Sequence, residues 1–296
     1  MARVIGGRRK RRSGADAVAG TVLRLAVLLQ AGVAPDAAWR HLAAVDPAAA
    51  AVARELERGA SVVAALRDRG GAWADIAAAW EIATTVGAPL ADSLRGMAEA
   101  LRDAHAAMDD ARIALAEPAG TARLMLWLPL VGAALGMALG FDTLAVLFGS
   151  PGGIACLVGG AAFLLAARRW TGALVRRAQP APGIPGLHAE LTAVALAGGV
   201  SIDRARQLVD AAGIAAAGET DEVLQLSREA GVPAVELLRA SAAHARQEAR
   251  TGNRLRAAAL SSRLLLPLGV CTLPAFLLLG VAPLLLSVLS TTPLPL

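Results

Sequence analysis

Two stretches of the chain are apolar enough to enter a membrane. Residues 124–167 carry one charged side chain, Asp142, and residues 264–289 carry none. A helix needs roughly 20 apolar residues to cross the hydrocarbon core of a bilayer. The first stretch has room for two such helices, because the turn-forming run 149–153 (GSPGG) divides it. We therefore predict three transmembrane helices, at 124–148, 153–167 and 264–289.

The rest of the chain has helical periodicity, and no segment alternates as a half-buried strand does. Val22, Leu25 and Leu29 lie on one face of a helix predicted over 16–31, and Gly32 can end that helix in a left-handed conformation. The predicted fold class is therefore all-α: a polytopic membrane protein whose polar parts are helical bundles.

One short pattern occurs twice, shortly before an apolar stretch each time. Residues 86–104 read VGAPLADSLRGMAEALRDA, and residues 230–248 read AGVPAVELLRASAAHARQE. An offset of 144 pairs Gly87 with Gly231, Pro89 with Pro233, Leu94 with Leu238, Arg95 with Arg239 and Arg102 with Arg246. Because internal repetition indicates architecture, we predict two helical modules. They are unequal, since the first holds about two extra helices, near 47–57 and 61–69.

Each copy contains a Gly-x-Pro element that favours a joint between two helices. Gly87 and Gly231 can adopt positive φ at a helix end, and Pro89 and Pro233 suit the first turn of the next helix. These four residues are the candidate joint residues. The helices that follow are predicted to run to about 116 and 262, either as long stalks that reach the membrane or as ordinary hairpins.

The two predicted stalks differ in charge. Residues 89–117 carry three arginines and six carboxylates, a net charge of −3, whereas residues 233–263 carry six arginines and two carboxylates, a net charge of +4. One hypothesis is that the acidic stalk faces the basic one, within a subunit or between subunits. The alternative is two solvated faces.

Arginines gather at the ends of the predicted spans, where the positive-inside rule expects cytoplasmic residues. With the basic run 8–12 (RRKRR), they predict a cytoplasmic N-terminus and an extracytoplasmic C-terminus in the plasma membrane. A cleavable signal peptide is disfavoured, because Arg24 and Gln30 interrupt the apolar run that follows the basic residues. The predicted parts besides the spans are a basic tail (1–16), a first cytoplasmic module (17–123), a second cytoplasmic module (168–263) and an outer tail (290–296).

The sequence lacks the motifs of common enzymes. Lys10 is the only lysine, so the chain cannot form a lysine-containing phosphate loop, and HExxH, CxxC and GxSxG are absent. We therefore predict no catalytic, cofactor or metal site. Nucleic-acid binding is also disfavoured despite the net charge of +5, because only 3% of residues are aromatic.

Small residues and prolines mark the predicted spans. Gly132, Gly136 and Gly140 form a face on the first span that lets another helix approach closely. Pro274 lies in the middle of the third span, where proline removes a backbone hydrogen bond and kinks a helix. These four residues are candidates for packing within the membrane.

These features together resemble the type II secretion system F family, the inner-membrane platform proteins of type II secretion, type IV pilus and tight-adherence pilus machines. The resemblance lies in the opening LAVLLQAGV at 25–33, the Gly-x-Pro elements and the proline-punctuated ending at 263–286. It covers roughly residues 20–290, and the predicted order of modules and spans also matches.

The resemblance implies a non-enzymatic protein without cofactors, embedded in the lipid bilayer. Its partners would be a cytoplasmic secretion ATPase, pilin-like subunits, and further copies of itself or a paralogous platform protein. The recurring arginines are candidate partner contacts: Arg95, Arg102, Arg239 and Arg246. A small transporter or channel subunit is the main alternative, and a membrane-anchored receptor is another. Few spans and no charged pathway through them favour the platform.

Overall fold

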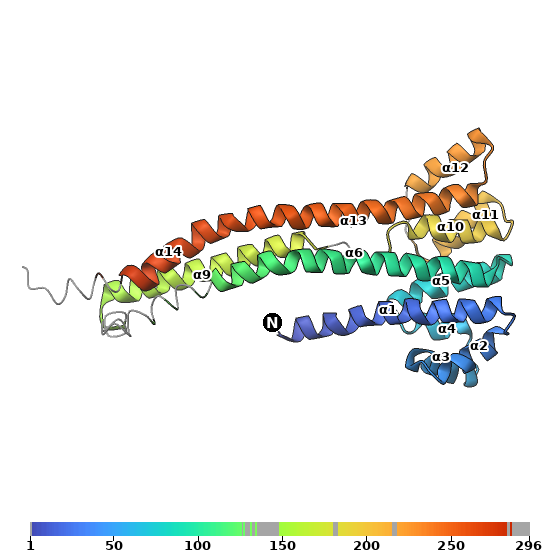
Figure 1. The fold of residues 1–296 in the computed structure, drawn as a ribbon, viewed down its shortest axis with the longest axis horizontal. Helices are drawn as coiled ribbons and strands as arrows, with labels where there is room; N and C mark the ends of the chain where they lie inside the picture. Colours follow the sequence, from blue (N-terminus) through green and yellow to red (C-terminus); the bar gives the residue numbers. More distant parts are fainter. Residues whose placement is uncertain are drawn as a thin grey trace, which may run out of the picture. The chain divides into compact units, whose positions relative to one another are not determined.

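The computed structural model describes residues 2–125, 148–179, 183–214 and 218–282, with Trp127, Val131, Ala134 and Leu285 as isolated positions. All regular elements in this part of the chain are helices, as predicted (Figure 1). The chain divides into two compact units. Unit 1 comprises Met1–Met108 and Pro182–Thr251, and unit 2 comprises Asp109–Ala181 and Gly252–Leu296.

Five helices form the first part of unit 1. They are α1 (Ala2–Gln30), α2 (Pro35–Ala43), α3 (Pro47–Glu57), α4 (Val62–Arg67) and α5 (Ala72–Val86). The Asp46 carboxylate accepts N–H groups at the start of α3, and the Ser61 hydroxyl caps α4 in the same way. The two extra helices predicted near 47–57 and 61–69 are thus confirmed as α3 and α4. Helix α1 begins earlier than predicted, so the basic run 8–12 belongs to it.

A tryptophan cluster lies in the core that these helices enclose. The Trp39 ring is fully buried, and its centroid lies 6.3 Å from that of Trp73 and 6.4 Å from that of Trp80. Such separations suit tilted aromatic pairs. Leu25 of α1 and Leu191 belong to the same buried cluster, so residues far apart in sequence share one core in unit 1.

The second part of unit 1 contains α10 (Leu187–Ala197), α11 (Ile202–Ala211) and α12 (Gly218–Ala230). All residues from His188 to Ala195 are buried, so α10 is the central helix of the unit. Glycines at its two ends permit close packing. A Cβ atom on Gly186 would lie 2.7 Å from the Ala242 backbone, and one on Gly198 would lie 2.3 Å from the Val86 side chain.

Two long helices follow the Gly-x-Pro elements. Helix α6 (Leu90–Met125) has 36 residues and α13 (Ala234–Pro267) has 34. At about 1.5 Å per residue, each is roughly 50 Å long. They extend beyond the predicted ends at 116 and 262 without a break, so each stalk is one continuous helix.

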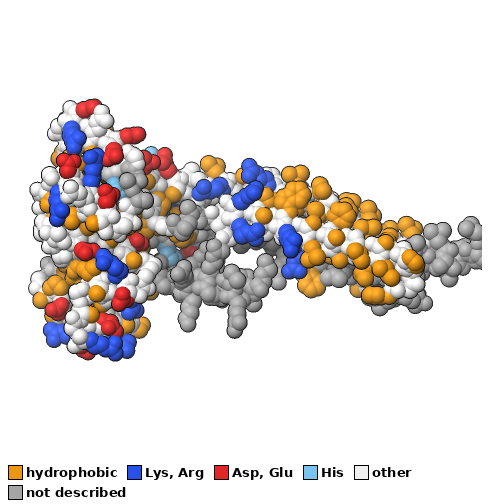
Figure 2. Space-filling view, turned by 180° about the vertical axis from the view of Figure 1, so that it is seen from behind, with side chains coloured by type: hydrophobic (Ala, Val, Ile, Leu, Met, Phe, Trp, Pro, Cys, Tyr) orange, Lys and Arg blue, Asp and Glu red, His pale blue; other side chains and the backbone are white. Residues whose placement is uncertain are grey.

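Unit 2 contains α9 (Pro151–Arg177) and the end of α13, which continues through η1 (Leu268–Thr272), α14 (Leu273–Phe276) and η2 (Leu277–Val281). Two helical stretches in the described part are long and apolar enough to cross a membrane, Pro151–Arg177 and Ala234–Val281. Apolar side chains gather on the surface of this unit (Figure 2). Helix α9 is longer than the predicted crossing at 153–167, and the predicted first span lies almost entirely outside the described residues.

Candidate coupling site

The first joint connects α5 to α6 through Gly87. This glycine has φ 72° and ψ 25°, a left-handed conformation that side chains disfavour. The Ala88 N–H donates to the Ala83 carbonyl over 2.9 Å, which closes the end of α5. The next helix opens at once, since the Ser93 N–H donates to the Pro89 carbonyl over 3.0 Å. The chain therefore changes direction within three residues.

The second joint connects α12 to α13 in the same way. Gly231 has φ 67°, and its N–H donates to the Ser227 carbonyl over 3.0 Å. The Ser227 hydroxyl donates to the Val232 carbonyl over 2.7 Å, and Pro233 directly precedes α13. The positive φ predicted at both glycines is confirmed, and both prolines stand immediately before a long helix.

An ion cluster joins three helices of unit 1. The Arg246 guanidinium of α13 lies 3.3 Å from the Asp103 carboxylate of α6 and 3.4 Å from the Glu190 carboxylate of α10. The Arg246 side chain is 11% exposed and that of Glu190 is 7% exposed. A Cβ atom on Gly96 would lie 2.9 Å from Glu190 Oε1, so this glycine leaves room for the buried carboxylate.

A second ion pair joins the same two stalk helices within unit 2. The Arg254 Nη2 atom of α13 donates to the Asp110 Oδ2 atom of α6 over 2.8 Å. This pair is more exposed, with 59% of the Arg254 side chain and 28% of the Asp110 side chain accessible. The hypothesis that the acidic stalk faces the basic one is thus confirmed within one chain.

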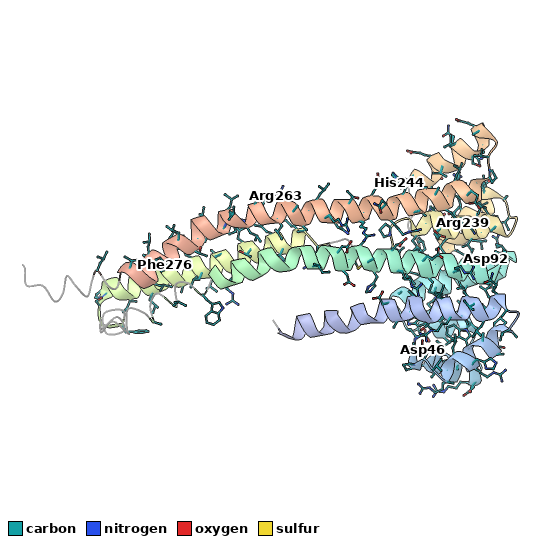
Figure 3. The ribbon with its side chains drawn as sticks, viewed as in Figure 1. Asp46, Asp92, Arg239, His244, Arg263 and Phe276 are labelled. Atoms are coloured by element: carbon teal, nitrogen blue, oxygen red, sulfur yellow. The ribbon has the colours of Figure 1, made fainter. Side chains whose placement is uncertain are left out.

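The other candidate arginines have different surroundings. Arg95 donates to Gln30 of α1. Arg239 lies 3.6 Å from Glu236 of its own helix (Figure 3). Arg102 is exposed and has no ion-pair partner among the described residues. The sequence pairs Arg102 with Arg246, but only Arg246 is held inside the bundle.

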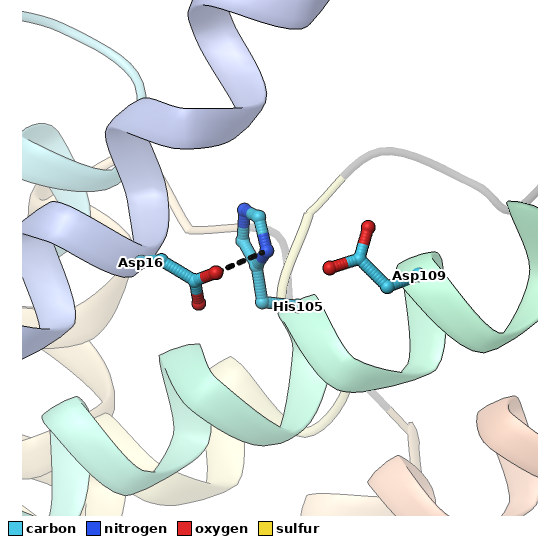
Figure 4. A group of neighbouring side chains, drawn as sticks. All are labelled: Asp16, His105 and Asp109. Carbon is cyan, nitrogen blue, oxygen red and sulfur yellow. Dashed lines mark ion pairs between the residues drawn. The ribbon is translucent and has the colours of Figure 1, made fainter.

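A histidine near the middle of α6 contacts α1. The His105 Nδ1 atom lies 3.5 Å from the Asp16 Oδ2 atom (Figure 4). His105 is buried, with 7% of the residue exposed, while the Asp16 side chain is 61% exposed. This contact fastens α1 to the stalk near the end of unit 1.

Three side chains of unit 1 have displaced pKa values. Burial raises the pKa of Asp75 on α5 to about 6. Burial also acts to raise the pKa of Asp46, but hydrogen bonds from Thr21, Ala48 and Ala49 and the charge of Arg24 together lower it. Burial lowers the pKa of His188, whose Nδ1 atom lies 2.9 Å from the Thr220 hydroxyl.

Residues 22–138 match the sequence model of a family described as Type II secretion system (T2SS), protein F. This part of the chain therefore resembles the type II secretion system F domain. No curated protein and no solved structure matches the chain. Members of this family are membrane platform proteins of secretion and pilus systems.

The type II secretion system F domain covers less than half of the chain. It contains the first joint and the stalk helix α6, with Arg95 and Arg102. The second joint lies beyond the matched residues, so the likeness of the two joints rests on the sequence repeat and on their backbone geometry.

Sequence reasoning missed the Glu190 carboxylate. Its signal was nevertheless present, because Glu190 is the only acidic residue of helix α10, which is apolar apart from Glu190, His188 and Thr192. A lone acid on a helix that is buried along its length needs a buried partner. The sequence did not identify that partner, since Arg246 lies 56 residues away.

The candidate packing residues of the membrane part have separate outcomes. Gly132, Gly136 and Gly140 lie outside the described residues. Pro274 lies in the short α14, which has π-helical turns on both sides, so the helix is irregular around this proline. Sequence reasoning missed Gly160 of α9, where a Cβ atom would lie 2.4 Å from the Leu279 side chain of η2.

Proposed function

We propose that this protein is a non-enzymatic membrane platform of a pilus-assembly or type II-like secretion machine. In this role it couples a cytoplasmic secretion ATPase to pilin-like subunits that leave the bilayer. The observation that carries the proposal is the continuity of α13. This helix starts at the second joint, and the helical stretch Ala234–Val281 continues into a membrane-length apolar segment. A displacement of the joint is therefore transmitted along one helix.

Bracing between the stalks supports this role. The buried Arg246 pairs and the Arg254–Asp110 pair hold α6 and α13 together at two levels. Along α6 the paired residues Asp103 and Asp110 are seven positions apart, and along α13 Arg246 and Arg254 are eight apart, or about two helical turns in each helix. A force applied to one stalk is thus shared with the other instead of bending it alone.

Three arginines of the stalk helices, Arg95, Arg102 and Arg239, are the proposed ATPase contacts. Arg102 projects from α6 without an ion-pair partner among the described residues, and Arg95 and Arg239 each lie about two helical turns after the proline of their joint. Arg246 is removed from this group, because its guanidinium is held by Asp103 and Glu190.

Co-purification with a cytoplasmic secretion ATPase of the same cell tests the coupling role. Arg102→Glu should reduce retention of the ATPase on the membrane-extracted protein and reduce pilus or substrate export. Arg228→Glu is the matched control, since Arg228 is an exposed arginine on α12 of the same unit. If the ATPase is not retained by the wild-type protein and export survives deletion, the platform role is wrong.

A transporter or channel subunit remains the alternative function. Transport pathways through a membrane are marked by ionisable residues that face a cavity. The described apolar parts of the two candidate spans, 151–167 and 264–282, carry no charged side chain. Solute flux through vesicles that contain only the purified protein would favour the alternative.

A further inference from the structure

Unit 2 contains a groove between α9 and α13 with a cavity volume of about 320 Å³. Helix α9 contributes one wall and α13 the other. The lining residues are Leu174, Arg177 and Ala178 from α9, and Leu255, Arg256, Ala259, Leu260 and Arg263 from α13.

The floor of the groove is apolar. Ala178 and Leu260 are buried, and they belong to a small cluster that Leu174 packs against. Leu255 lines the groove and is 66% exposed. The groove therefore offers an uncovered apolar surface as well as a polar rim.

The rim carries three arginines and no carboxylate. Arg256 donates to the Asn253 side chain. None of Arg177, Arg256 and Arg263 has an ion-pair partner among the described residues of unit 2. Three like charges around one opening repel one another, and an anion between them removes that repulsion.

The groove lies where the apolar segments end. Arg263 directly precedes the uncharged run that begins at Leu264 (Figure 3). On α9, the uncharged segment ends at Ala167, and Arg177 lies ten residues further on, about 15 Å along the helix. Under the predicted orientation, the groove lies at the cytoplasmic boundary of the bilayer.

We propose that this groove binds an anionic phospholipid. The phosphate is held by the three guanidinium groups, which bind phosphate oxygens through paired hydrogen bonds. An acyl chain lies against Leu174, Leu255 and Leu260. A free phosphate ion uses the rim but not the apolar floor, whereas a phospholipid uses both. Basic pockets between membrane helices on the cytoplasmic side recognise anionic headgroups in this way.

Native mass spectrometry of the full-length protein in neutral detergent tests the proposal. Phosphatidylglycerol is titrated against phosphatidylcholine of the same acyl chains, and inorganic phosphate is added as a competitor. The wild-type protein should bind phosphatidylglycerol at least tenfold more tightly than phosphatidylcholine, and millimolar phosphate should leave most of the lipid bound.

The groove variant replaces all three lining arginines by glutamine: Arg177→Gln, Arg256→Gln and Arg263→Gln. The matched control replaces three exposed arginines of α9 outside the groove: Arg168→Gln, Arg169→Gln and Arg176→Gln. We expect at least a tenfold loss of phosphatidylglycerol affinity in the groove variant and less than a twofold loss in the control. A third variant, Arg177→Lys, Arg256→Lys and Arg263→Lys, keeps the positive charge at the three groove positions. It therefore separates loss of lipid binding from loss of folding.

A second readout locates the lipid. Trp170 lies one helical turn before Leu174 on the same face of α9 and is 42% exposed. In a Trp127→Phe background, phosphatidylglycerol with brominated acyl chains should quench the fluorescence of Trp170 in the wild-type groove and much less in the groove variant. Equal losses in the groove and control variants, equal affinity for phosphatidylcholine, or displacement of the lipid by phosphate would each overturn the proposal.

Discussion

Removing Arg246 should destabilise unit 1 far more than removing its exposed partner Asp103. Arg246→Met leaves the Glu190 carboxylate buried, with 7% of its side chain exposed and no cation beside it. Breaking a buried ion pair from one side costs about 3–5 kcal/mol. The Arg246 side chain is itself 11% exposed, so we expect the lower end of this range, about 3 kcal/mol.

Two further variants separate burial from charge. Asp103→Asn removes the exposed partner, whose side chain is 62% accessible, and should cost less than about 1 kcal/mol. The double variant Glu190→Gln/Arg246→Met removes the buried charge together with its partner. It should recover most of the free energy of unfolding that Arg246→Met loses, because a neutral buried pair does not carry the full desolvation penalty of an isolated carboxylate.

Urea unfolding of the detergent-solubilised protein measures these differences. In a Trp127→Phe/Trp170→Phe background, fluorescence of the buried Trp39, Trp73 and Trp80 cluster reports unit 1 directly. Arg254→Met is the matched control, because it breaks the exposed pair with Asp110 and should cost less than about 1 kcal/mol. The reasoning is refuted if Asp103→Asn is as damaging as Arg246→Met, or if the double variant is less stable than Arg246→Met alone.

Three other outcomes follow from the backbone and the buried groups. Gly87→Ala should cost about 1–2 kcal/mol in thermal unfolding because of its positive φ, whereas Gly252→Ala, within a helix, should stabilise by about 0.5–1 kcal/mol. Gly160→Leu should lower the unfolding midpoint of unit 2 in detergent by forcing α9 away from η2, and Gly172→Ala, whose Cβ meets only a flexible arginine, should not. Folding favours the protonated form of Asp75, because its pKa is raised from 3.8 to about 6. The contribution of this side chain to the free energy of unfolding is therefore complete below the unfolded pKa and is lost as pH rises through the folded pKa. The stability of the wild-type protein relative to Asp75→Asn should therefore fall between pH 4 and pH 7, and parallel melting curves across that range would contradict the assignment.

Local features of the fold were predictable from the sequence. Gly87 and Gly231 are followed by proline at the second position, and few backbone geometries other than a left-handed helix end accommodate that pattern. Helices α3 and α4 were also predictable, because Asp46 and Ser61 are strong N-cap residues. In each of these cases the signal lies within a few residues of the element that it determines.

Features that depend on distant contacts were not predictable. The pairing of Arg246 with Glu190 requires α10 and α13 to pack, and a periodic pattern does not show which helices meet. Arg102 and Arg246 are equivalent in the repeat, but one is exposed and the other is held in an ion cluster. Residues at matching positions of the repeated pattern therefore do not share an environment.

The packing role of Gly160 could not be predicted from the sequence. Gly160 is one of several small residues in α9, and only the position of Leu279 shows which of them the neighbouring segment contacts.

The partner contacts proposed at Arg95, Arg102 and Arg239 stay predictions. Their exposure or local pairing is a property of this chain, whereas contact with an ATPase depends on a second protein.

The ion pair between Asp110 and Arg254 joins two residues that are 144 positions apart, which is the offset of the repeated pattern. The first stalk therefore meets its own counterpart at the equivalent position. If two first stalks paired with each other in that register, carboxylate would face carboxylate, and two second stalks would bring guanidinium against guanidinium. Opposite charges at matching positions thus favour the mixed pair over either self-pair. At this position the two stalks are therefore complementary in charge and not interchangeable.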